Sequence, residues 1–309
     1  MIRRLSFLEL SELKQSLSLA LGVFDGIHLG HQALIGRAVE HAKKEQGLSG
    51  VVTFEPHPIA VLAPERAPRR LLASLAHKEC ILDELGVDLL IVVPFDREFA
   101  ELEPEDFLAQ LGKAPRLSYL TMGSDWRFGK GRRGDISLLQ DFGRSEEIRV
   151  EPVDAVMMAG ERISSTRIRQ ALRDGSLIAA NEMLGRAYSV MGEVLKGKQL
   201  GRKIGFPTAN LIPDNEQLPS EGVWAVDCRW EGGDWHPAVA NLGRRPTVES
   251  DLERVLEVHL LDWEGELYGQ TLEVRFRRFL RSEKKFDDLE ALKAQIVLDV
   301  ETARLGDDK

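Results

Sequence analysis

Apolar runs alternate with amphipathic stretches along the first half of the chain. Continuous apolar or β-rich runs occur at 17–24, 50–54, 87–93 and 117–123. The spacing of apolar residues predicts helices at 31–45, 74–85 and 104–111. Continuous apolar strands separated by helices favour an α/β domain, with a parallel sheet covered by helices on both faces. A mixed α+β domain is the alternative.

The pattern changes near residue 185, where two short helical pieces, 166–175 and 176–185, come to an end. Short β-type runs separated by turn residues then follow at 188–195, 222–230, 235–243, 254–263 and 271–280. Their spacing is typical of a sandwich or a closed barrel, and we favour a β-barrel. A closing amphipathic helix is predicted from the helical spacing of Phe286, Leu289, Leu292, Ile296, Val300 and Ala303.

Length, composition and charge agree with two globular domains and narrow the function. The chain has 309 residues, enough for about two domains, and its 43% hydrophobic and 29% charged residues are a globular balance. The 41 basic and 50 acidic residues give a net charge of −9. That excess of acid disfavours a protein whose main task is to hold a nucleic-acid backbone. Nucleotide substrates, which need only a local pocket, stay open.

No sequence pattern predicts secretion or membrane insertion. Cys80 and Cys228 are the two cysteines, which excludes a disulfide scaffold and a Cys-x-x-Cys zinc site. Glu9 and Glu12 interrupt the apolar residues at the start, so we predict no signal peptide. The longest apolar stretch, near 89–95, is far too short for a membrane span. We therefore expect a soluble cytoplasmic protein.

The segment GVFDGIHLGH joins the first apolar strand to the first helix. In parallel sheets ligands bind beyond the carboxyl ends of strands, where helix N-termini offer free amides to phosphate. Gly22, Gly26 and Gly30 would let the backbone approach a ligand closely. His28 and His31 would then donate to phosphate oxygens. Two alternatives are a zinc site, for which no third ligand has a helpful spacing, and a capping or core role without chemistry.

A second motif, ISSTRIR, has the residues of a helix N-cap beside several arginines. Ser164, Ser165 and Thr166 are suited to capping the helix that follows. The arginines nearby are Arg162, Arg167 and Arg169. Three of them around one cap favour a polyphosphate, although one of them is expected to be a surface residue. Capping and phosphate binding are compatible, and we expect both.

The glycine-rich, basic segment GSDWRFGKGRRGD follows the fourth strand. It contains Asp125 and Arg127 together with the aromatic residues Trp126 and Phe128. Taken alone it is a loop with a solvated run of charges. Its place after a strand also allows it to hold a planar ring.

The segment GFPTAN is the counterpart in the second half of the chain. Pro207 fixes its own φ and restricts Phe206 to extended geometry, so Thr208 and Asn210 would lie on the same side of an extended stretch. A hydroxyl and an amide oxygen are hard neutral ligands, suited to Mg²⁺ that carries a nucleotide phosphate. The alternative is a turn in which both residues satisfy backbone groups.

Glu257 lies in the middle of the predicted strand at 254–263. By alternation it shares one face with His259, while Leu256 and Val258 point the other way. The carboxylate is either a solvent-facing side chain or a general base for a hydroxyl substrate.

Taken together, these motifs resemble the bacterial bifunctional riboflavin kinase/FMN adenylyltransferase family over essentially the whole chain. His-x-Gly-His by itself resembles only the wider nucleotidylyltransferase superfamily. The further matching segments are TFEPHP, GSDWRFGKGRRGD, ISSTRIR, LGRAYSVMGEV, GRKIGFPTANL, ANLGRRPTV, EVHLLDWEGELYG and LRSEKKF. Trp126 and Trp224 depart from the family pattern, in which phenylalanine and tyrosine are usual. Both keep a flat side chain, so we expect changed packing or flavin affinity and not lost activity.

The resemblance implies a fold and two reactions. Residues 1–182 would form a Rossmann-like FMN adenylyltransferase domain, and 183–309 a Greek-key β-barrel riboflavin kinase domain with a closing C-terminal helix. The barrel would transfer the γ-phosphoryl group of ATP to riboflavin, and the first domain would join FMN to a second ATP to give FAD and pyrophosphate. ATP, riboflavin and FMN are the implied small-molecule partners, with Mg²⁺ or another divalent cation. No nucleic-acid or membrane partner is expected, and a homo-oligomer stays open.

The resemblance also implies roles for individual residues. Glu257 would accept the proton of the riboflavin hydroxyl, and Thr208 and Asn210 would organise Mg²⁺ and the ATP phosphates. His28, His31 and Arg169 would act on the polyphosphate in the first domain. The implied binding positions are Gly22, Phe24, Asp25, Gly26, Asp125, Arg127, Arg162, Ser165, Thr166, Gly205, Pro207, Thr208 and Asn210.

Two other hypotheses stay open beside the bifunctional enzyme. In one, only the kinase works and the first domain binds or regulates; the intact His28, His31 and ISSTRIR speak against it. In the other, the barrel is a flavin sensor without turnover. A sensor predicts the loss of Thr208, Asn210 or Glu257, and all three are present.

Overall fold

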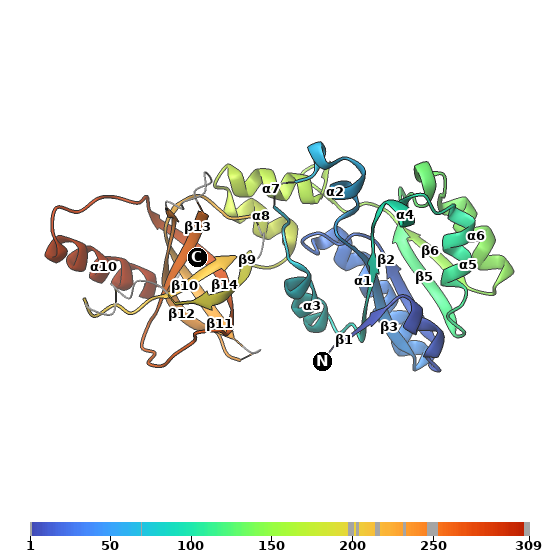
Figure 1. The fold of residues 1–309 in the computed structure, drawn as a ribbon, viewed down its shortest axis with the longest axis horizontal. Helices are drawn as coiled ribbons and strands as arrows, with labels where there is room; N and C mark the ends of the chain where they lie inside the picture. The colour runs from blue at the N-terminus through green and yellow to red at the C-terminus, as the bar shows by residue number, and fades with distance from the viewer. Residues whose placement is uncertain are drawn as a thin grey trace. The chain divides into compact units, whose positions relative to one another are not determined.

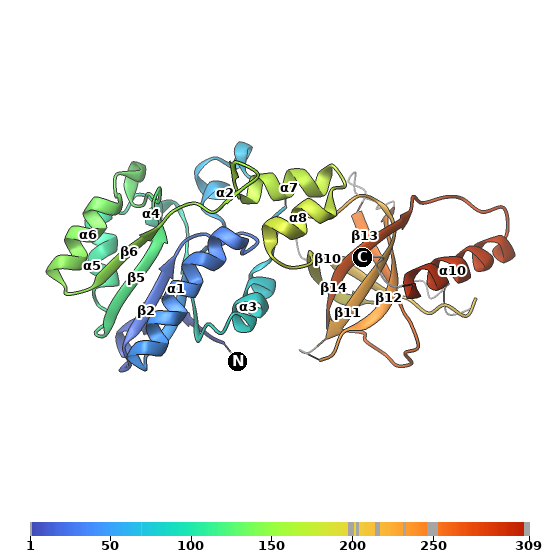
Figure 2. The same cartoon turned by 180° about the vertical axis from the view of Figure 1, so that it is seen from behind.

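The computed structural model forms two units, Met1–Arg167 and Ile168–Lys309 (Figures 1 and 2). It describes residues 2–68, 70–196, 201, 204–213, 217–230, 233–245 and 253–305. Over these residues no helix has the length and apolar character needed to cross a membrane.

The first unit is built on a six-stranded sheet in the order β1-β4-β3-β2-β5-β6. Its strands are β1 (Arg3–Ser6), β2 (Leu17–Leu21), β3 (Leu48–Glu55), β4 (Leu89–Pro94), β5 (Leu117–Gly123) and β6 (Arg149–Val153). All five pairings are parallel, which confirms the predicted Rossmann-like parallel sheet. The edge strands β1 and β6 were not predicted, because each is short and has few fully buried side chains.

Helices cover both faces of this sheet. They are α1 (Leu29–Glu45), α2 (Pro58–Leu62), α3 (Leu75–Glu84), α4 (Arg97–Ala100), α5 (Pro104–Leu111) and α6 (Ile136–Ser145), with 3₁₀ turns at Leu8–Glu12, Pro64–Arg66 and Lys130–Arg132. One core cluster joins α1 and α3 to Ala20, Val51 and Leu90. The other joins α5 and α6 to their strand neighbours Leu19 and Val52. The alternation along β2 and β3 therefore divides the core into two layers.

The strand order reverses beside β2. From β2 the chain adds β3 and β4 on one side of the sheet and then β5 and β6 on the other. In parallel sheets the carboxyl edge at such a reversal is where ligands bind. The loop between β2 and α1, which carries the predicted histidine pair, lies at this edge. A small hairpin, β7 (Met157–Met158) and β8 (Glu161–Arg162), follows β6, and α7 (Ser165–Arg173) begins after it.

The second unit contains a closed antiparallel barrel in the order β10-β13-β12-β11-β14-β9. After α8 (Leu177–Leu184) its strands are β9 (Ser189–Leu195), β10 (Ala209–Pro213), β11 (Gly222–Trp230), β12 (His236–Arg245), β13 (Glu253–Leu260) and β14 (Thr271–Arg281). β11, β12 and β13 are successive neighbours, and β10 pairs with β13, which is a Greek-key arrangement. The barrel prediction is confirmed, and the sandwich alternative is wrong.

The closing helix α10 (Leu289–Arg304) packs on the barrel by a narrower contact than its sequence predicts. Ala303 packs in a buried cluster with Val223 and Ala225. The Asp299 carboxylate forms an ion pair with the Arg281 guanidinium on β14, with a nitrogen–oxygen distance of 2.7 Å. Leu289, however, is 60% exposed. The expected apolar stripe is therefore buried only in part, because the helix is held largely by an ion pair and its C-terminal turns.

Candidate active sites

The loop between β2 and α1 has a strained backbone. Phe24 and Ile27 have φ values of 52° and 41°, and Gly26 has a φ of 80°. Positive φ is uncommon for bulky side chains and persists only where the surroundings enforce it. Phe24 and Ile27 are fully buried, so core packing holds this turn in one conformation.

The strained turn delivers two stacked histidines to the start of α1. The rings of His28 and His31 lie 3.7 Å apart between centroids and are nearly parallel. His28 is the N-cap, and its Nδ1 accepts from the backbone N–H of His31 at 3.3 Å. The edge of Phe24 contacts the His31 ring. His28 therefore caps α1, as in the alternative without chemistry, and the pair also lies where helix amides and the helix dipole favour an anion.

Asp25 and the glycines of this loop contact other parts of the first unit. The backbone N–H of Leu72 donates to Asp25 Oδ1 at 2.8 Å, and Ser165 Oγ donates to the Asp25 carbonyl at 2.8 Å. A Cβ at Gly26 would lie 2.7 Å from Leu72, and one at Gly22 3.0 Å from Phe24. The space beside these glycines is thus filled by the protein's own side chains. We had expected this space to let a ligand approach the backbone.

The start of α7 has the predicted cap. The backbone N–H of Arg167 donates to Ser164 Oγ at 3.3 Å, and Ser165 links the same turn to Asp25. Thr166 is exposed, and Arg169, one turn along the helix, is buried.

The two arginines that flank this cap are engaged with carboxylates. Arg162 donates to both carboxylate oxygens of Asp125, and this hydrogen bonding holds the pKa of Asp125 below its usual value. Arg167 pairs with Glu161 at 3.2 Å. Of the three arginines expected around a polyphosphate, two therefore already have anionic partners.

The glycine-rich loop after β5 is folded on itself. Arg127 pairs with Asp135 at 2.8 Å, and Asp135 caps α6 by accepting from the Leu138 N–H. The Leu138 hydrogen bond, and then Arg127, lower the pKa of Asp135. Trp126 stacks on Phe128 with centroids 4.8 Å apart. The flat tryptophan side chain thus packs against Phe128 within the loop, where Arg127 and Asp135 form an ion pair.

In the second unit, the GFPTAN segment enters β10 through a turn fixed by His259. Gly205 has a φ of 90°, which favours glycine. His259 Nδ1 lies 2.8 Å from the Pro207 carbonyl oxygen, and the edge of the Phe206 ring meets the histidine ring. Thr208 follows directly. Arg202, Lys203 and residues 246–248 of the matching segments lie outside the described residues.

Glu257 lies between two asparagines in the barrel register. It pairs with Asn210 on β10 and with Asn241 on β12, so the three side chains share one face. Leu256 and Val258 are fully buried. The predicted alternation is confirmed: Glu257 and His259 point away from the barrel interior.

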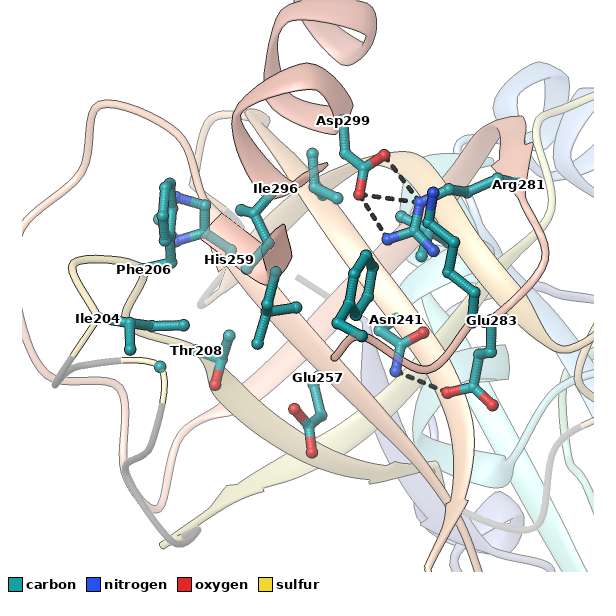
Figure 3. Close-up of a pocket in the computed structure, with 16 residues that line it drawn as sticks. Ile204, Phe206, Thr208, Asn241, Glu257, His259, Arg281, Glu283, Ile296 and Asp299 are labelled. Atoms are coloured by element: carbon teal, nitrogen blue, oxygen red, sulfur yellow. Dashed lines mark hydrogen bonds and ion pairs between the residues drawn. The ribbon is translucent and has the colours of Figure 1, made fainter. Parts of the chain in front are cut away.

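Glu257 lines a cavity of about 360 Å³ between the barrel and α10 (Figure 3). Two interactions hold polar side chains of its wall in place. Asn241 donates a hydrogen bond to Glu283 at 2.9 Å, and Arg281 forms an ion pair with Asp299. The remaining wall is largely apolar, with Ile204, Phe206, Val223, Val239, Phe286, Leu292 and Ile296.

Four residues of this wall were not predicted from the sequence: Asn241, Arg281, Glu283 and Asp299. Asn241 lies in ANLGRRPTV, and Arg281 and Glu283 lie in LRSEKKF. Both segments match the family, but only the barrel register and the position of α10 bring them to Glu257.

A second cavity, of about 630 Å³, meets the first at Thr208. Thr208 lines both cavities. The second is bounded by Pro207, Ala209 and the segment Trp263 to Tyr268, together with Val194 and Leu260. A ligand in either cavity would therefore lie near Thr208.

The donor set at this boundary suits a hard cation. Over the described residues, no group of three or more His, Cys, Asp or Glu side chains could hold a metal ion. Thr208 instead offers a hydroxyl, and Asn210, 7% exposed, an amide whose Nδ2 donates to the Thr208 carbonyl. Neutral oxygen ligands of this kind suit Mg²⁺ that is bound chiefly by nucleotide phosphates.

Comparison with known proteins gives the same division of the chain. A family model described as FAD synthetase matches residues 10–167, and one described as riboflavin kinase matches 184–305. The bifunctional riboflavin kinase/FMN adenylyltransferase of Escherichia coli K12 is 42% identical over 287 residues, covering 93% of this chain and 91% of the relative. The Bacillus subtilis protein with the same description is 36% identical, covering 92% and 90%.

A solved structure has the same fold over nearly its whole length. A crystal structure from Streptococcus pneumoniae, described as a macrolide-efflux protein, is 31% identical with a TM-score of 0.82. The match covers 98% of this chain and 99% of that one.

A methyl group added at Gly26, in the turn before the histidine pair, should destabilise the folded protein. Gly26→Ala would place a Cβ at positive φ and against Leu72, so we expect it to lower the free energy of unfolding by about 2–4 kcal/mol. Equilibrium urea unfolding measures this. Gly36→Ala is the matched control: it lies in α1 with no atom within 4 Å of the new Cβ, and should be neutral or stabilising by up to about 1 kcal/mol. Equal effects at both positions would contradict the strained turn.

Proposed function

The chain belongs to the bifunctional riboflavin kinase/FMN adenylyltransferase family. From this premise we propose which of its two sites carries out each reaction. The enzyme phosphorylates riboflavin to FMN and then adenylylates FMN to FAD. Both reactions are transfers at phosphorus, which depend on in-line positioning and on neutralised oxygens more than on a covalent intermediate.

The β2–α1 turn is the proposed adenylylation site. An oxygen of the FMN phosphate attacks the α-phosphorus of ATP, a new P–O bond forms, and the bond to the β-phosphate breaks to release pyrophosphate. His28 and His31 donate to the polyphosphate, where charge grows on the leaving group. The stacked pair at the N-terminus of α1 supports this assignment.

Ser165, Thr166 and Arg169 are proposed to lie beside the same polyphosphate. Asp125 and Arg127 are proposed for the flavin side, with Arg162 acting through its pair with Asp125. Gly22, Phe24, Asp25 and Gly26 form the turn itself.

The boundary between the two cavities is the proposed kinase site, and Thr208 at that boundary is the observation that carries this assignment. The apolar cavity beside Glu257 suits the flavin ring, and the larger cavity suits ATP. The riboflavin hydroxyl attacks the γ-phosphorus, its proton passes to Glu257, and ADP leaves. Gly205 and Pro207 hold the turn that presents Thr208.

Mg²⁺ is proposed to bind with ATP at Thr208 and Asn210, where it would neutralise phosphate charge. We also propose that the adenylyltransferase domain comprises 1–182 and the kinase domain 183–309, and that the enzyme is cytoplasmic, where its small-molecule substrates are found. Whether it works as a monomer or a homo-oligomer does not enter either reaction.

Replacing both histidines should separate the two activities. In His28→Ala/His31→Ala, FAD formation from FMN should fall by at least about 10³-fold, because the donors to the polyphosphate are lost. Chromatography of flavins over time measures both steps, and riboflavin conversion to FMN by the same chain is the internal control. If FAD still forms at the normal rate, the histidine pair is not the site.

Glu257→Gln should have the opposite effect. Riboflavin phosphorylation should fall by about 10²–10⁴-fold, as is typical for loss of a general base, while supplied FMN is still converted to FAD. The exposed Glu301 on α10 gives the control Glu301→Gln, which should leave both steps unchanged. Normal phosphorylation by Glu257→Gln would exclude this residue as the base.

The threonine hydroxyl should set the metal requirement of the kinase step alone. Thr208→Val should raise the Mg²⁺ concentration that gives half-maximal riboflavin phosphorylation, while Thr208→Ser, which keeps the hydroxyl, should stay near normal. Titration of Mg²⁺ at fixed ATP measures this for each step. An equal shift in the adenylylation step, or none in the kinase step, would contradict the assignment.

A further inference from the structure

Lys78 on α3 is a buried lysine for which the two reactions above provide no role. Its side chain is 1% exposed, although lysine is almost never fully buried unless it is paired. Nζ donates to the carbonyl oxygen of Val23 at 3.4 Å. α3 thus directs a cationic group at the turn that carries the histidine pair.

The charges of two carboxylates act on this amine. Burial lowers the pKa of Lys78, and the charges of Asp25 and Glu55 oppose that change by stabilising the ammonium form. Oε2 of Glu55 is buried and has no hydrogen-bond partner in the described part of the chain. The amine is therefore held by electrostatic attraction as well as by its contact with Val23.

The carbonyl that Lys78 contacts is the last one before the strained part of the turn. Thr53 Oγ1 donates to the same Val23 oxygen at 2.9 Å. The next residue, Phe24, has positive φ, a conformation that persists only where neighbours enforce it. Two donors from β3 and α3 thus fix the peptide group from which Phe24 and then His28 follow.

Packing alone does not account for a lysine here. Replacing a buried charge by an apolar side chain of similar size is often neutral or stabilising, because the charged group must be desolvated. An apolar side chain would fill the same space but would not bind the Val23 carbonyl. The hydrogen bond to the Val23 carbonyl thus explains why an amine lies here.

We propose that Lys78 is a positioning residue for adenylyl transfer, acting through the Val23 carbonyl to hold the turn that presents His28 and His31. The inference rests on the proposed function of that pair. A small displacement of a group that stabilises developing charge lowers the rate more than it weakens substrate binding, since a shift of about 1 Å can cost roughly 10²-fold.

The test uses the full-length variant Lys78→Met, assayed for FAD formation from FMN and ATP. The kcat should fall by about 10²-fold, while the KM for ATP changes by less than about threefold, as for an interaction that matters in the transition state. Riboflavin phosphorylation, proposed for the second unit, should be unchanged, and urea unfolding, as used for Gly26→Ala, reports whether the first unit is folded. Lys113→Met, at an exposed lysine of the same unit, should be normal in both steps. A kcat within about threefold of normal would overturn the proposal.

A second set of variants separates a folding defect from a loss of catalysis. It also tests whether Lys78 and Thr53 act through the same carbonyl. If Lys78→Met is poorly folded, Lys78→Met/Glu55→Gln removes the one of the two carboxylates that has a buried oxygen without a hydrogen bond. It should restore folding but not adenylylation, and restored adenylylation overturns the proposal. Thr53→Val, alone and combined with Lys78→Met, completes a double-mutant cycle. Losses that are not additive support a common target at Val23, and additive losses contradict it.

His28→Ala/His31→Ala in the same assay separates the two claims. If it keeps FAD formation, the proposed site itself fails. If it loses FAD formation while Lys78→Met keeps it, only the role of Lys78 fails.

Discussion

A backbone carbonyl held by a side chain from a distant segment precedes the candidate catalytic residues in both units. In the first unit Thr53 and Lys78 hold the Val23 carbonyl. In the second, His259 meets the carbonyl of Pro207, directly before Thr208. Phosphoryl and nucleotidyl transfer depend on placing donors where charge develops. Fixing the peptide group before the donor achieves this without covering the donor itself.

The sequence predicted the architecture well because both domains have strong periodic signals. Continuous apolar strands such as 87–93 are expected to be buried on both faces, so the pattern favoured a doubly covered sheet over a mixed α+β domain. The edge strands β1 and β6 were not predicted, because few of their side chains are buried and their sequences lack a continuous apolar run. The exposed Leu289 on α10 shows the reverse: helical spacing predicted a helix correctly, but no local pattern reports how much of its apolar face meets a partner.

The candidate sites were predictable where the chemistry lies within one segment. His28 and His31 are three residues apart, and one helical turn brings them together. Asn241 and Glu283 were missed because they reach Glu257 only through the barrel register and the chain after β14. Lys78 was missed for a related reason: in a helical sequence a lysine predicts a solvated side chain, and only the tertiary fold buries it.

Each unit has its own hydrophobic core, and this bears on how two reactions coexist in one chain. The clusters that support the histidine turn are built mainly from residues of the sheet and of α1, α3, α5 and α6, whereas Val223, Ala225 and Ala303 support the kinase cavity. Each of these three clusters of described residues draws its members from one unit. The buried thiol of Cys228, whose pKa is raised well above its usual value by burial, lies in a barrel strand as an apolar packing residue, and the kinase step needs no nucleophile from it. The histidine pair and Glu257 are thus supported by different sets of packed side chains.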